Sequence, residues 1–219
     1  ASAIVRLEPG AVVLLAAAEA MSRLCAPGDR SVNVIFGDGA GAAVITSAGP
    51  GGSPENGGSG IVVEDVLLSS DGAHGEILTA DGGGSRAAYA SPDSRVGEGY
   101  FLRMEGREVF RLAVSRMAEA SLALLARNGL APEDVDLFVP HQANGRIIEA
   151  VGERLGIPAG RTATYLEDVG NTSAASIPLA LEQARTQGRL RPGGRVLLAS
   201  FGAGFTWGAA LARVNGAAS

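Results

Sequence analysis

Residues 104 to 214 alternate between helical spacing and short apolar runs, and this alternation constrains the fold more than any other feature of the chain. Apolar residues recur with the spacing of amphipathic helices over 104–129, 143–156 and 173–188. Apolar runs of strand length fall at 134–140, 162–168, 195–201 and 205–214. Because strands and helices follow one another in this order, the sequence predicts an α/β fold, with a mixed sheet covered by helices.

The first hundred residues predict strands and loops. Strands are expected at 11–18, 31–37, 41–48 and 61–70. The second and third of these are expected to form a hairpin, because the "DGAG" sequence near their junction suits a tight turn. Loops are expected at 49–60 and 71–100. The opening "ASAIVRLEPG" indicates the end of a helix whose beginning is missing.

Composition excludes several classes of function. The net charge of −5 argues against a nucleic-acid partner, and no apolar run approaches the ~20 residues of a membrane-spanning helix. All 18 basic residues are arginine, so neither a Schiff-base lysine nor a P-loop lysine exists here. Cys25 is the only cysteine, which rules out an internal disulfide and favours a reducing, cytoplasmic location. The first residues lack the features of a signal peptide.

Three loops carry candidate functional groups at positions where strands are predicted to end. "PHQAN" contains His141, "DVGNTS" contains Asn171, and "SFGAGF" contains a glycine turn over 202–204. Reactive groups in open α/β sheets gather beyond the carboxyl ends of the strands. An imidazole, a carboxamide and free backbone N–H groups could together hold a carbonyl oxygen as it gains negative charge. Taken singly, either side chain could instead have a purely structural role, as a hydrogen-bonded histidine or a turn asparagine.

Four motifs resemble those of a known enzyme family. "VPHQAN", "GNTSAASIP", "FGAGFTWG" and "FGDGAGAAV" are similar to the motifs of β-ketoacyl-acyl-carrier-protein synthase III, a condensing enzyme of the thiolase-like superfamily. The resemblance implies two pseudo-equivalent halves with mixed five-stranded sheets, helices layered around them in five layers, and a homodimer. It implies that residues 101–219 form a complete C-terminal half that carries the histidine and asparagine of a Cys-His-Asn triad. Residues 1–100 would be the remainder of the N-terminal half, with a strand hairpin and a long loop.

The family activity is the start of fatty acid synthesis. An acyl-CoA acylates the cysteine, and malonyl-acyl carrier protein is then decarboxylated and condensed onto the acyl group. By resemblance, His141 and Asn171 would both donate hydrogen bonds to the malonyl thioester carbonyl. Phe201 would lie near the departing carboxylate, and the backbone N–H of Ala203 would contribute to the oxyanion hole. No cofactor and no metal are implied, since acyl-CoA and the acyl carrier protein are substrates.

Further residues match family positions that bind the substrates. Those resembling the CoA and pantetheine channel are Arg30, Gly106, Phe110 and Asn144. Arg107 stands where the family often has asparagine, so this chain departs from the family pattern at one pantetheine position. Phe36 resembles the base of the acyl pocket, with a plain core residue as the alternative. Arg146 resembles a basic residue that docks the acidic carrier protein, with a solvated helix charge as the alternative.

The nucleophile motif of the family is absent from this chain. Cys25 lies in "SRLCAPGDR", a loop sequence unlike the family's "ACAG" motif, so we do not expect it to be the nucleophile. The register places the motif upstream of Ala1, so the chain resembles the C-terminal two thirds of a synthase and is expected to be inactive alone. A separate chain carrying the N-terminal half is therefore a further candidate partner. The alternatives are a synthase III-like enzyme that primes polyketides or transfers acyl groups, and a non-catalytic thiolase-fold subunit.

Overall fold

A four-stranded mixed sheet forms the centre of the molecule. The computed structural model describes residues 1–8, 10–48, 60–82 and 99–215. The strand order is β3 (Ile61–Ser70), β8 (Thr206–Val214), β7 (Arg195–Gly202) and β6 (Leu137–Pro140). The β6–β7 pair is parallel, whereas β8 runs antiparallel to both of its neighbours. The predicted α/β class is therefore confirmed.

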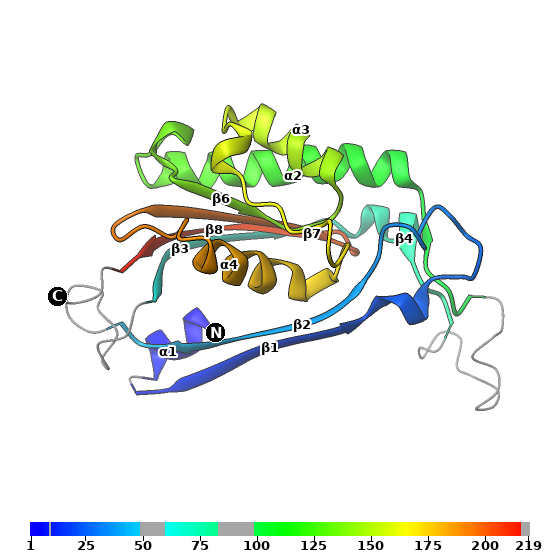
Figure 1. The fold of residues 1–219 in the computed structure, drawn as a ribbon, viewed down its shortest axis with the longest axis horizontal. Coiled ribbons are helices and arrows are strands. Elements are labelled where there is room, and N and C mark those ends of the chain that lie inside the picture. Colours follow the sequence, from blue (N-terminus) through cyan, green and yellow to red (C-terminus); the bar gives the residue numbers. More distant parts are fainter. Residues whose placement is uncertain (9, 49–59, 83–98, 216–219) are drawn as a thin grey trace.

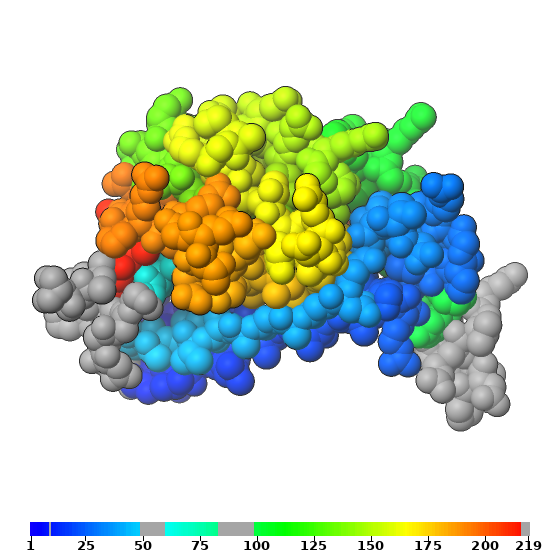
Figure 2. All heavy atoms as spheres, in the orientation of Figure 1, coloured from blue at the N-terminus to red at the C-terminus, as the bar shows by residue number. Residues whose placement is uncertain are grey.

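Helices cover both faces of this sheet (Figure 1). On one face lie α2 (Gly106–Arg127) and α3 (Gly145–Leu155), and on the other lies α4 (Ser176–Thr186). Beyond α4 lies a hairpin of β1 (Val12–Ala20) and β2 (Asp38–Thr46), which forms the lower layer in Figure 2. The described residues thus form four layers, where five were expected.

The hairpin exposes an apolar face on its outer side. Val12, Leu14 and Val44 are 70%, 67% and 67% exposed, and Leu14 pairs directly with Val44. No helix from the described residues covers this face (Figure 1). The first helix, α1 (Ser2–Leu7), lies beside the hairpin, and its Arg6 donates from Nη2 to the carbonyl of Glu64 on β3 at 3.4 Å.

The remaining elements are short. They are the 3-10 turns η1 (Met21–Leu24), η3 (Gly72–Ile77), η5 (Pro132–Asp134), η6 (Ala159–Arg161) and η7 (Ser173–Ala175), and the two-residue strands β4 (Leu78–Thr79) and β5 (Arg103–Met104). The predicted loop at 71–100 therefore begins with a turn and a strand, and its residues 83–98 lie outside the described part, as do 49–59 of the other predicted loop. Among the described residues, no helix has the length and apolar character needed to cross a membrane.

The helix ends and several strands lie where the sequence predicted them. Gly129, Gly156 and Gly188 have φ of +67°, +71° and +66°, the left-handed conformation expected just after a helix. The strand predicted at 61–70 has the same bounds as β3. The strand predicted at 11–18 overlaps β1, which spans Val12–Ala20. All four residues of β6 are buried, as expected for a central strand covered on both faces.

The hairpin predicted from 31–37 and 41–48 was wrong. Residues 31–35 form turns, because Asp29 accepts hydrogen bonds at Oδ1 from both the N–H and the hydroxyl of Ser31, and its carbonyl accepts from Asn33 N at 2.9 Å. The "DGAG" residues lie inside β2 rather than in a turn. Gly41 is needed for close packing, since a Cβ there would lie 2.6 Å from Pro178 of α4.

The fifth strand predicted at 162–168 is reduced to a single parallel bridge between Thr162 and Phe138. Side chains occupy the backbone groups that a longer ladder would need. Arg189 donates to the carbonyl of Thr162 at 3.1 Å, and the Oε1 atom of Gln142 accepts from Tyr165 N at 2.7 Å. The sheet therefore has four strands among the described residues, not five.

The division at residues 100 and 101 stays a prediction. The strand β3 lies before this boundary, yet it pairs along its whole length with β8, which lies after it. The four-stranded sheet thus draws on both predicted segments.

Candidate functional site

A large pocket lies at the ends of β6 and β7, between α2 and the segment that leads into α4. Its volume is about 1850 Å3, larger than the 300–1,000 Å3 typical of small-ligand sites. Nine of the predicted site residues line it, namely Phe36, Gly106, Phe110, His141, Asn144, Arg146, Asn171, Phe201 and Ala203. Arg30 does not, although its neighbour Ser31 does. These nine residues are up to 167 positions apart (203 minus 36) in the sequence, and the fold brings them to one pocket.

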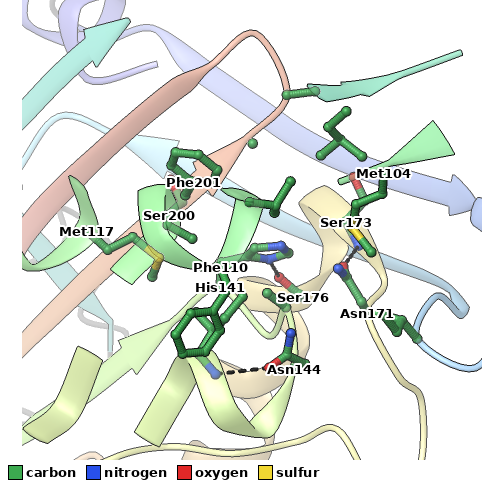
Figure 3. A pocket seen from close by; sticks show the side chains of 18 of the residues that line it. Met104, Phe110, Met117, His141, Asn144, Asn171, Ser173, Ser176, Ser200 and Phe201 are labelled. Carbon is green, nitrogen blue, oxygen red and sulfur yellow. Dashed lines mark hydrogen bonds between the residues drawn. The ribbon is translucent and has the colours of Figure 1, made fainter. Parts of the chain in front are cut away.

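His141 enters the pocket directly from the end of β6 (Figure 3). Its backbone N–H donates to the carbonyl of Ala199 at 2.7 Å, which continues the parallel β6–β7 ladder by one residue. Its Nδ1 atom lies 2.6 Å from the hydroxyl oxygen of Ser176. Burial lowers the pKa of His141 from 6.5 to about 4, so the imidazole is neutral at pH 7.

Asn171 enters the same pocket from the loop before η7 (Figure 3). The sequence predicted that Asn171 follows a strand, and this was wrong. Its backbone instead exchanges hydrogen bonds with the turn at residues 35–37. Asn171 N donates to the carbonyl of Ile35, and Gly37 N donates to the carbonyl of Asn171, both at 2.9 Å. Its side-chain Oδ1 accepts from Ser173 N at 2.9 Å, so the Nδ2 group is the part of the amide that can donate to a ligand.

Two further polar side chains fix the loop that carries His141. Gln142 is 1% exposed and donates from Nε2 to the carbonyls of Pro140 and Ala163, at 2.7 and 3.3 Å. Asn144 caps α3, because its Oδ1 accepts from Ile147 N at 2.9 Å. The cap orients Asn144 at the pocket wall while its Nδ2 group stays available as a donor.

The apolar end of the pocket is aromatic. The ring of Phe201, at the end of β7, lies 4.6 Å from the ring of Phe205, measured between centroids. Both residues are at least nine-tenths buried, with 7% and 2% exposure. A negatively charged group placed against Phe201 would be poorly solvated, which disfavours its charge.

Cys25 lies apart from this site. It is buried among Val32 and Leu102 and does not line the pocket. Burial raises the pKa of its thiol, and the nearby Asp38 and Asp29 carboxylates raise it further. Such a thiol is a poor nucleophile, which agrees with the prediction from the sequence. The described residues also contain no group of three or more His, Cys, Asp or Glu side chains that could hold a metal ion.

Two family models together match most of the chain. Residues 1–72 match the model for 3-oxoacyl-[acyl-carrier-protein] synthase III, and residues 125–214 match its C-terminal model. The chain belongs to the 3-oxoacyl-[acyl-carrier-protein] synthase III family. The predicted resemblance is thereby confirmed, and with it the thiolase-like fold.

Individual relatives agree with this family. A β-ketoacyl-[acyl-carrier-protein] synthase III of Nitratidesulfovibrio vulgaris (strain Miyazaki F) is 56% identical over 211 residues, which cover 96% of this chain and 61% of the relative. Synthase III 3 of Streptomyces coelicolor is 48% identical over 90% of this chain and 57% of the relative. The chain thus spans about three fifths of the length of these curated relatives.

Solved structures of synthases superpose on the chain. The Thermus thermophilus synthase III matches with a TM-score of 0.81 and 42% identity, over 100% of this chain and 63% of that one. A priming β-ketosynthase from the R1128 polyketide pathway matches with a TM-score of 0.74 and 36% identity, over 95% of this chain and 58% of that one.

Neither Ser176 nor Gln142 was predicted as a site residue, although both contact the His141 loop. Serine in a helix and glutamine in a loop are usually solvent-exposed, whereas these two are 2% and 1% exposed. Gln142 adjoins the histidine in the sequence, so its position was a usable signal. Ser176 lies 35 residues away from His141, and only the tertiary structure connects them.

We predict that Gly37→Ala disturbs the segment that holds Asn171. A Cβ at residue 37 would overlap the carbonyl oxygen of Val169, so this backbone would have to move. The expected cost is about 1–3 kcal/mol in the free energy of unfolding, measured by urea denaturation. Gly160→Ala is the matched control, since a Cβ there meets no atom within 4 Å. Equal stability of the two variants would contradict the prediction.

A second prediction concerns pH. Because the folded protein keeps His141 neutral down to about pH 4 while an unfolded histidine titrates near 6.5, only the unfolded state binds this proton between those values. The contribution of His141 to stability is complete above pH 6.5 and falls as the pH decreases to about 4, by about 3 kcal/mol. Urea denaturation from pH 7 to 4 should therefore show a steeper loss in the wild type than in His141→Gln. Parallel curves for the two proteins would refute this assignment.

Proposed function

We propose that this chain carries the decarboxylation site of a β-ketoacyl-acyl-carrier-protein synthase III. The observation that carries the proposal is that His141 and Asn171 line one pocket. One polar atom of each side chain, Nδ1 of His141 and Oδ1 of Asn171, is already hydrogen-bonded within the protein, which leaves Nε2 and Nδ2 for a ligand. Both side chains can therefore offer an N–H to the same ligand oxygen. Membership of the 3-oxoacyl-[acyl-carrier-protein] synthase III family supports the same chemistry.

The proposed reaction begins when malonyl thioester loses CO2. The bond between the α-carbon and the carboxylate breaks, and its electron pair moves onto the thioester as an enolate. His141 and Asn171 donate to the enolate oxygen, and each such donor contributes about 3–4 kcal/mol to transition-state stabilisation. The apolar ring of Phe201 favours departure of the carboxylate as neutral CO2. The enolate carbon then attacks an acyl thioester formed on a cysteine, and the cysteine leaves as thiolate.

The proposed substrates are an acyl-CoA primer and malonyl-acyl carrier protein. The pocket volume of about 1850 Å3 is large enough for a pantetheine arm, and Gly106, Phe110 and Asn144 lie along the pocket wall. Phe36 is proposed to limit the length of the primer, and the Ala203 N–H to complete an oxyanion hole. The exposed Arg146, at the start of α3, is proposed to contact the acidic carrier protein. Arg30 is proposed to contact the CoA adenine at the pocket mouth.

The full activity also needs a nucleophile that the described site lacks, since Cys25 lies outside it. We propose that the cysteine belongs to a segment equivalent to the part of the relatives that this chain does not match, on this chain or on a separate one. The exposed apolar face of β1 and β2 supports this proposal, because such a face favours a covering layer. A homodimer and a cytoplasmic location complete the proposal.

Polyketide priming is the second candidate function. It is supported by the similarity to the priming β-ketosynthase of the R1128 pathway. The condensation chemistry would be the same, and the two candidates differ in the primer and the carrier protein. Rates with a series of acyl-CoA primers of increasing length distinguish them.

The test uses an extended chain, in which the part of the Nitratidesulfovibrio vulgaris relative that this chain does not match is fused to it. We predict that the extended chain condenses acetyl-CoA with malonyl-acyl carrier protein, whereas the 219-residue chain alone does not. His141→Ala and Asn171→Ala in the extended chain should each lower the rate of malonyl thioester decarboxylation by about 100- to 1,000-fold. Release of CO2 from labelled malonyl thioester measures this step.

Matched controls are available for both variants. His74 and the exposed Asn33 do not line the pocket, so His74→Ala and Asn33→Ala should keep the wild-type decarboxylation rate. The proposal fails if the His141 and Asn171 variants decarboxylate as fast as these controls, or if the 219-residue chain condenses without an added nucleophile.

A further inference from the structure

The buried hydroxyl of Ser176 lies between the ring of His141, the candidate donor, and the backbone of the loop that carries His141. Ser176 is the first residue of α4 and is 2% exposed. Its Oγ lies 2.6 Å from His141 Nδ1, and the backbone N–H of Gln142 points to the same oxygen at 3.4 Å. Figure 3 shows the contact between the hydroxyl and the imidazole.

The directions of these two hydrogen bonds follow from the chemistry of the groups. A backbone N–H can only donate, so the Gln142 contact takes one lone pair of the hydroxyl oxygen. The oxygen keeps a second lone pair, so the contact with His141 Nδ1 could run either way. The hydroxyl is buried, however, and its proton has no acceptor other than Nδ1 among the described residues, so we assign the donation from Ser176 Oγ to Nδ1. A neutral imidazole carries one proton, and when Nδ1 accepts, that proton lies on Nε2.

We propose that Ser176 is a positioning residue that holds His141 in the Nε2–H tautomer and aims this N–H into the pocket. His141 is held at two points. Its backbone N–H donates to the carbonyl of Ala199, and the Nδ1 atom of its ring is bonded to Ser176. Nε2 is the remaining polar atom of the ring, and it is the atom that a pocket ligand can reach. The catalytic consequence of this tautomer rests on the proposed function, whereas the tautomer itself does not.

The arrangement parallels that of Asn171. One polar atom of that side chain is bonded to Ser173 N, and the donor end is left for the ligand. The segment from η7 to the start of α4 thus orients both donors, one through a backbone N–H and the other through a hydroxyl. Ser176 acts through His141 and makes no proposed contact with substrate.

The first experiment measures the tautomer by NMR in the 219-residue chain labelled with 15N-histidine. His141→Gln identifies the signals of residue 141, because the chain has only 2 histidines. At pH 7 the wild type should show a single tautomer with the proton on Nε2. Ser176→Ala should give a mixture of both tautomers, and Ser176→Thr, which keeps a hydroxyl, should restore the single one.

The matched control is Ser121→Ala. Ser121 is a fully buried helix serine outside the pocket, and its hydroxyl has no hydrogen-bond partner in the described part of the chain. It should leave the His141 signals unchanged. A wild-type His141 protonated on Nδ1 would overturn the proposal, as would a Ser176→Ala protein that still shows only the Nε2–H tautomer.

The second experiment measures decarboxylation in the extended chain. Ser176→Ala should lower kcat by about 10- to 100-fold, with little change in KM, because a misaimed donor affects the transition state more than binding. Ser176→Thr should recover most of the rate. An unchanged kcat in Ser176→Ala would overturn the positioning role. Absence of activity in the wild-type extended chain would instead count against the proposed function and leave the NMR result intact.

Discussion

The parallel pairing of β6 with β7 is the constraint on which the site depends. The strand β6 has four residues, all of them buried. It pairs with β7 on one side and forms a single bridge to Thr162 on the other. His141 follows at once, and its backbone N–H extends the ladder. An imidazole would be costly to bury inside the sheet, so its position at the first residue beyond the strand lets the ring reach the pocket while its backbone stays fixed.

Burial and hydrogen bonding both orient the two proposed donors before a ligand binds. The imidazole is desolvated and therefore neutral, and its Nδ1 contacts a hydroxyl. The carboxamide of Asn171 is oriented by a backbone N–H. Groups that are already oriented need not reorganise as charge develops on a bound ligand, which is the main requirement for electrostatic stabilisation. Gln142 contributes by satisfying three backbone groups around the loop with one buried amide.

Periodicity predicted the helices, their terminal glycines and most of the central sheet, because those patterns reflect local geometry and burial. It failed where side chains took over backbone hydrogen bonds, as Asp29 does in the turn before Phe36 and Arg189 does beside Thr162. It also mistook glycines required for close packing on α4 for turn residues. The motifs predicted His141 and Asn171 as neighbours, but Ser176 joins the site through a contact between distant segments that no local pattern encodes.

The backbones of the two proposed donors are attached to different layers of the molecule. His141 is fixed to the four-stranded sheet through Ala199, whereas Asn171 is fixed through Ile35 and Gly37 to the connection between the hairpin strands. Ser176, which contacts His141, lies on the same segment as Asn171, so the two positions are also joined to each other through the residues that lead into α4. The spacing of the two side chains therefore depends on how the hairpin packs on α4, where Gly41 leaves no room for a side chain beside Pro178.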